Sequence, residues 1–140
     1  MTDRGHAAVE LALAVGVLLF PVALVVLGFA PWSERRVEAE AVAAEVARST
    51  VLELSHEAGL ATATATTAAY GIPPHQTRLG WCGAEPTGSG AGSCTFARGA
   101  VVSVTVQLWT PLFDTPWGAI GGLWVTGEHS EPIDLYRSLG

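Results

Sequence analysis

The sequence predicts an α+β protein. An N-terminal transmembrane helix continues into an amphipathic helical region, and a small antiparallel β-sheet head follows. Three observations lead to this class. Residues 11–30 form a mostly apolar run without any charge, residues 39–54 place small and apolar side chains at helical spacing, and residues 100–109 alternate apolar with polar side chains. The 140 residues leave room for one modest domain after the apolar run.

The apolar run is long enough to cross a bilayer, because about 20 helical residues span a hydrocarbon core of about 30 Å. It has no polar stripe of the kind found on the core helix of a small soluble domain. Glu10 directly precedes the run, and a carboxylate beside a membrane segment is a functional candidate. Pro21 removes one backbone donor within the run, so we expect it to kink or loosen the helix there.

Three interpretations of this N-terminus are open. A cleaved secretory signal peptide is disfavoured, because Pro31 would follow the cut and block the usual peptidase. A plain signal anchor is the second interpretation. The third is a pilin-type N-terminus, in which a short leader is removed after Gly5, so that His6 starts the mature chain and Glu10 is its fifth residue.

Residues 4–13 read RGHAAVELAL, an arginine–glycine pair followed by small residues, Val-Glu and a continuous apolar helix. This stretch resembles the start of TadE-like minor pseudopilins of the Tad (Flp-type) pilus system. The resemblance implies a leader peptide at residues 1–5, processing between Gly5 and His6, and a transmembrane helix at 6–30. It also implies that Glu10 acts in subunit registration, and that the partners are other pilins or pseudopilins, a prepilin peptidase and pilus platform proteins.

The chemistry of Glu10 fits that role. Its carboxylate can pair with the new N-terminal ammonium of a neighbouring helix, and such a pair is strong at low dielectric. Because leaving either charge unpaired there is expensive, the pair sets register more than it adds net stability. The alternative is that Glu10 simply lies among the lipid headgroups.

The orientation is predicted from conflicting signals. Arg4 precedes the apolar run while Arg35 and Arg36 follow it, so arginine counting alone would place the C-terminal side in the cytoplasm. The cysteine pair favours an oxidising compartment, and the resemblance implies a cytoplasmic N-terminus. We therefore expect a single-pass protein of the cell membrane with an extracytoplasmic head.

Residues 31–72 are predicted to form a helical stalk. Residues 31–34 indicate a break or a helix restart with Ser33 as its N-cap, and the helix then runs to about residue 54. Its expected apolar face consists of Ala39, Ala43, Val46, Ala47, Thr50, Val51 and Leu54. Ser55 can cap a second helix that stops at Gly71. Alternating alanine and threonine at 61–69 leave a strand or a low-complexity stalk as alternatives.

Residues 73–140 are predicted to form the β-rich head. Strands are expected at 77–81 and 100–109, with Pro111 ending the second strand, and at 123–130 as its antiparallel partner. The apolar, glycine-containing segment 112–122 is expected to be a loop, either a lid over the sheet or an exposed patch, and we favour the lid. An extended tail at 131–137 follows.

Cys82 and Cys94 bracket a glycine- and serine-rich segment in the head. A disulfide closing this loop would stabilise a small extracytoplasmic domain by roughly 2–3 kcal/mol. A metal site with His75 or His129 is the alternative. It is disfavoured because neither a CxxC motif nor paired-histidine spacing is present, and we predict no metal.

The sequence contains no motif for catalysis or cofactor binding: no nucleophile elbow, Walker loop, GxGxxG or HExxH. We therefore predict no enzyme activity, no catalytic residues and no cofactor. The net charge of −6 and the scattered arginines argue against nucleic-acid binding, which leaves membrane lipid and protein partners. The predicted function is that of a membrane-anchored minor pseudopilin contributing to Tad-type pilus assembly or secretion. The alternative is a single-pass envelope protein, unrelated to pili, whose head binds a ligand or protein partner.

Overall fold

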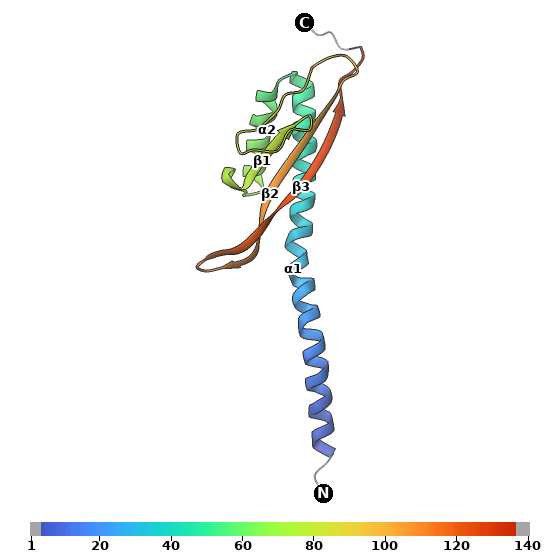
Figure 1. Cartoon of the computed structure of the whole chain (residues 1–140), viewed down its shortest axis with the longest axis vertical. Helices are drawn as coiled ribbons and strands as arrows, with labels where there is room; N and C mark the ends of the chain where they lie inside the picture. The colour runs from blue at the N-terminus through green and yellow to red at the C-terminus, as the bar shows by residue number, and fades with distance from the viewer. Residues whose placement is uncertain (1–3, 137–140) are drawn as a thin grey trace. The chain divides into compact units, whose positions relative to one another are not determined.

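The structure, a computed structural model, describes residues 4–136, with the side chains of 4–8, 27–30 and 113–115 left aside. The chain divides into two compact units, Met1–Ser33 and Glu34–Gly140. The elements in chain order are α1 (Arg4–Glu53), α2 (His56–Ala69), the 3-10 helix η1 (Pro74–Gln76), β1 (Thr77–Trp81), β2 (Val101–Thr115) and β3 (Gly118–Pro132) (Figure 1). The predicted class, an apolar N-terminal helix followed by a small antiparallel sheet, is confirmed.

The first unit contains the apolar part of α1. Every side chain at positions 9–26 is exposed, including the large Leu18 and Phe20. The predicted break at 31–34 is wrong, because α1 continues through Pro31 and Ser33 does not begin a new helix. A proline removes only one helical hydrogen bond, and the apolar turns before it and the packed turns after it favour the helix strongly enough to offset that loss.

The second unit begins with the remaining turns of α1. Ion pairs between Arg35 and Glu38 at 2.9 Å and between Arg36 and Glu40 at 3.1 Å support these turns at helical spacing. The predicted apolar face is confirmed, with Leu54 only partly buried and Val42 as a further buried residue on it. This face packs against the domain's own sheet.

Helix α2 begins and ends where the sequence predicts. The Ser55 hydroxyl accepts a hydrogen bond from the Ala58 N–H at 3.4 Å, which makes Ser55 the N-cap. At the other end Gly71 adopts a φ of 69°, and the Ile72 N–H donates to the Thr67 carbonyl at 2.9 Å. This is a Schellman ending, in which glycine takes the left-handed position and buried Ile72 packs behind it.

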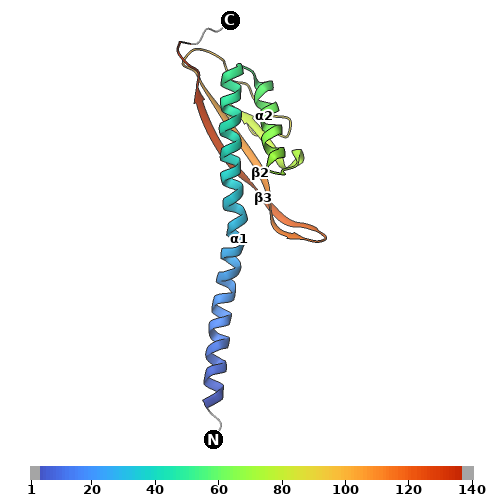
Figure 2. The ribbon, with the colours of Figure 1, turned by 180° about the vertical axis from the view of Figure 1, so that it is seen from behind.

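The sheet has three antiparallel strands in the order β1-β2-β3. One face is buried, and its β2 members are Val102, Val104, Val106, Leu108 and Thr110. Helices α1 and α2 cover this face (Figures 1 and 2). The alternation predicted for 100–109 is thus confirmed, and the predicted strand at 77–81 has the bounds of β1.

The strand end predicted at Pro111 and the favoured lid at residues 112–122 are wrong, whereas the alternative of an exposed apolar patch agrees with the exposed Trp117 and Ile120. Pro111 lies inside β2 opposite Gly122, and the two strands stay paired as far as Thr115 and Gly118 around a turn at residues 116–117. The segment is therefore a β-hairpin rather than a loop or lid. Pro111 is tolerated because β1 pairs with β2 only as far as Leu108, so β2 has an edge position at the proline.

Two glycines in the second unit allow close packing against α1, one from α2 and one from β3. A side chain at Gly59 of α2 would overlap the Thr50 hydroxyl of α1. A side chain at Gly127 of β3 would overlap the main chain of Ala39 and Glu40. The two helices and the sheet therefore meet at distances that only glycine allows at these points.

Candidate functional site

The predicted processing and registration residues lie at the start of α1. Gly5 and His6 lie in its first turn, and their predicted roles stay predictions. Glu10 is exposed, as are Val9 and Leu11 on either side of it. The carboxylate therefore lies on an apolar helix surface and is available to a partner group.

Within the described part of the chain, one helix is long and apolar enough to cross a membrane. It lies within Val9–Glu53, where the most apolar stretch has a mean hydropathy of 2.8 and no buried residues. Pro21 lies in this stretch without interrupting α1, and the predicted kink stays a prediction.

Cys82 and Cys94 form the predicted disulfide, with their Cα atoms 5.4 Å apart. Because both sulfur atoms are in the disulfide, neither cysteine is free to act as a thiolate ligand in the metal site considered as the alternative. The segment between them folds back along β1: the Leu79 N–H donates to the Thr87 carbonyl at 2.8 Å, and the Trp81 N–H donates to the Ala91 carbonyl at 2.8 Å. The disulfide loop therefore covers the edge of β1 that faces away from β2.

His56 connects this loop to the first turn of α2. Its Nε2 accepts a hydrogen bond from the Cys94 N–H at 2.9 Å. Its ring lies edge-on to Trp81, with centroids 5.4 Å apart, and tilted against Phe96 at 4.8 Å. His56 is therefore a hydrogen-bonded histidine that also packs between two aromatic rings.

The sheet face away from the helices has an aromatic cluster. Trp109 and Trp124 are cross-strand neighbours with ring centroids 5.4 Å apart, and the Arg78 guanidinium lies 3.9 Å above the Trp124 ring. Together with His75 and Gln76, the two tryptophans line a shallow pocket of about 280 Å³. Aromatic faces beside polar donors can bind a small polar ligand or a peptide.

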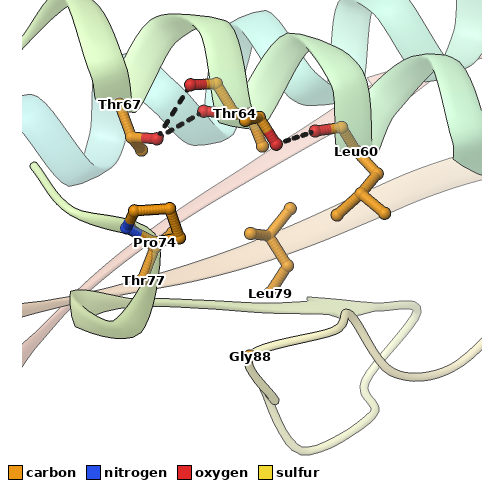
Figure 3. Close-up of a pocket in the computed structure, with 8 residues that line it drawn as sticks. Leu60, Thr64, Thr67, Pro74, Thr77, Leu79 and Gly88 are labelled. Atoms are coloured by element: carbon orange, nitrogen blue, oxygen red, sulfur yellow. Dashed lines mark hydrogen bonds between the residues drawn. The ribbon is translucent and has the colours of Figure 1, made fainter.

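A second, smaller cavity lies between α2, η1, β1 and the disulfide loop (Figure 3). Its volume of about 40 Å³ is on the scale of a water molecule rather than an organic ligand. Thr67 and Thr77 are among its lining residues. The Thr67 hydroxyl donates to the Ala63 carbonyl at 2.8 Å, so it is already satisfied within α2.

The β2–β3 hairpin is the feature that sequence reasoning missed. Trp117 at its turn is 94% exposed, and Leu112 and Ile120 on its strands are also exposed. The available signal was the apolar content on both sides of residues 116–117, which suits a hairpin as well as a loop. The proline at position 111 predicts the end of a strand, and that local signal outweighs the apolar content.

Among the residues that the structure describes, no group of three or more histidine, cysteine, aspartate or glutamate side chains is placed to hold a metal ion. What the described chain offers is an apolar helix surface with one carboxylate, an aromatic pocket and an apolar hairpin tip. Comparison with known proteins finds no family model, curated protein or solved structure that matches this chain.

Proposed function

We propose that this chain is a membrane-anchored minor pseudopilin that contributes to assembly of a Tad-type pilus or to the related secretion process. In this proposal residues 1–5 are a leader, the N-terminus is cytoplasmic, and the second unit is the extracytoplasmic head. The N-terminal stretch RGHAAVELAL supports it by its resemblance to TadE-like proteins.

The observation that carries the proposal is the contrast between two parts of α1. At positions 9–26 all side chains are exposed and nearly all are apolar, whereas at positions 39–51 one face is buried in the head. A continuous apolar surface of that size is unfavourable in water and indicates contact with lipid or with other apolar helices. Neighbouring copies in a membrane offer both.

Glu10 supports an assembly role within that surface. Its carboxylate is exposed beside Val9 and Leu11, where a bilayer or a helix bundle would remove water from it. An unpaired charge in that environment is costly, so pairing with the N-terminal ammonium of a processed neighbour would fix the relative height of two helices.

The first test is the N-terminus of the protein extracted from membranes of cells that express the matching peptidase. Intact-mass measurement is expected to show a chain that begins at His6. A chain that keeps Met1 or Thr2 under these conditions contradicts the pseudopilin proposal, while leaving the membrane anchor itself in place.

The second test compares Glu10→Ala with Glu34→Ala, which removes another exposed glutamate of α1 outside the apolar run. Glu10→Ala is expected to be cleaved normally but to impair piliation, whereas Glu34→Ala should assemble pili as the unmodified chain does. Normal piliation with Glu10→Ala would reject the registration role.

A second candidate function is that of a single-pass envelope protein whose head binds a ligand or protein partner. The pocket lined by His75, Trp109 and Trp124 favours it, because aromatic rings beside polar groups form a binding surface. Trp124→Ala separates the two functions. Under the leading proposal it leaves piliation and N-terminal processing unchanged, and under the second it abolishes the function of the head.

A further inference from the structure

We propose that the tip of the β2–β3 hairpin, residues 112–120, inserts into the surface of the bilayer that α1 crosses and so fixes the head against the membrane. This inference rests on the membrane anchoring in the proposed function. It adds a second, independent membrane contact to the anchor, made by the head itself.

The tip is unusually apolar for an exposed hairpin. Trp117 at the turn is 94% exposed, Ile120 is 61% exposed and Leu112 is 53% exposed, and Pro116 is exposed beside Trp117. Tryptophan favours the membrane–water interface, where its ring can enter the apolar region while its N–H remains hydrogen-bonded. In water the same surface is unfavourable and calls for a partner.

The hairpin is built as an ordered projection. Its strands remain paired as far as Thr115 and Gly118, and Trp109 packs edge-on against Trp124 at its base. Gly122 lies directly beneath the Trp109 ring, where any side chain would overlap the ring. A tip held in this way loses little conformational entropy on insertion.

In both views of the ribbon the hairpin projects in the direction of the N-terminal turns of α1, and its tip bends away from that helix (Figures 1 and 2). Gly127 lies beside Ala39, and the strand from there to the turn can reach up to about 33 Å at 3.3 Å per residue. The helix needs only about 8 Å to run from Ala39 back to Glu34. The strand is therefore long enough for the tip to lie level with Glu34, the first residue of the second unit.

The composition of the hairpin favours contact with the apolar part of the lipid interface rather than with charged headgroups. Asp114 is the only charged residue between Trp109 and Gly127, and the segment contains no arginine or lysine. A surface that recognises phosphate or anionic headgroups would carry basic residues. We therefore expect insertion to occur in zwitterionic bilayers and to persist at high salt.

The test uses the full chain reconstituted at low density in phosphatidylcholine vesicles. Trp117→Cys carries a nitroxide label at the tip, and Tyr136→Cys carries the same label as the matched control. Both parent residues are aromatic and 94% exposed, and Tyr136 lies outside the hairpin, four residues after the end of β3. Ile120→Cys is a second reporter on the tip, and mass measurement of one label per chain shows that the disulfide cysteines stay paired.

The readout is the collision of the label with oxygen, which concentrates in the bilayer, and with a water-soluble nickel chelate. The labels at 117 and 120 are expected to lose most of their nickel collisions and to gain oxygen collisions, whereas the label at 136 keeps the aqueous pattern. An aqueous pattern at 117 and 120 in chains that float with the vesicles overturns the hairpin proposal alone. Failure to float refutes the anchor itself.

One further outcome assigns the tip to a protein partner. Dipolar broadening between labels at 117, at a protein density too low for random encounters, would show that two tips contact each other. That result would also overturn insertion, because the tip of each chain would then be covered by a second copy.

Discussion

The contact between β3 and α1 at Gly127 provides the sharpest test of how the head is packed. We consider Gly127→Ala, the smallest possible change at that site. The added methyl group would lie 2.6 Å from the Ala39 carbonyl oxygen, and still closer to the adjoining main-chain atoms of Ala39 and Glu40. Main chain cannot rotate away as a flexible side chain can, so the helix and the strand must separate.

The size of that separation sets the expected effect. Ordinary contact begins at 3.4 Å, so relieving the 2.6 Å contact with the Ala39 carbonyl oxygen alone requires a movement of about 0.8 Å, and the closer main-chain atoms require more. A gap of that size forfeits a quarter to a half of the dispersion energy of each affected contact. Val42, Ala43 and Val46 follow on the same helix face and are fully buried. We expect Gly127→Ala to lower the free energy of unfolding by about 1–3 kcal/mol.

The assay is thermal unfolding of the full chain in mild detergent. Unfolding is monitored by near-ultraviolet circular dichroism, to which the buried Trp81 contributes. For a domain of this size the loss corresponds to a melting temperature lower by about 5–20 °C. Gly88→Ala is the matched control, because nothing lies within 4 Å of the added methyl group there. If the Gly127→Ala and Gly88→Ala variants have the same melting temperature, the close packing of β3 on α1 is wrong.

Three further predictions concern the disulfide and the aromatic contacts of the head. Neither Cys82 nor Cys94 should react with an alkylating agent before reduction, and the double change to serine should cost about 2–4 kcal/mol in urea unfolding. His56→Ala leaves the Cys94 N–H without its acceptor, so it should cost about 1–3 kcal/mol, while Glu57→Ala on the exposed side of the same turn should cost less. Arg78→Ala removes the cation–π contact, so it should shift the Trp124 emission and lower the free energy of unfolding by about 0.5–1 kcal/mol. Arg78→Lys keeps a cation near the ring, so both changes should be smaller.

The sequence predicted those parts of the fold whose signals are local. Ser55 and Gly71 mark the ends of α2, because a cap hydroxyl and a left-handed glycine act within one helical turn. The alternation from Val102 to Leu108 predicts a strand with one buried face, since that pattern follows directly from the pleat. The disulfide was likewise predictable from two cysteines in a loop-rich head.

The parts that were missed depend on neighbours distant in the chain. Pro111 would break a central strand, but β1 stops pairing with β2 at Leu108, and no local pattern shows where a neighbouring strand ends. Pro31 is a comparable case, because the helix continues through it with packed turns on its C-terminal side. The aromatic pocket required the register that places Trp109 opposite Trp124, which sequence alone did not supply.

The disulfide loop affects whether another β-strand can pair with the edge of β1. The main-chain N–H groups of Leu79 and Trp81 already donate to the loop, so an approaching strand finds these donors of β1 occupied. Two copies that met at this edge would therefore touch through side chains and would not extend one sheet into the other at these positions.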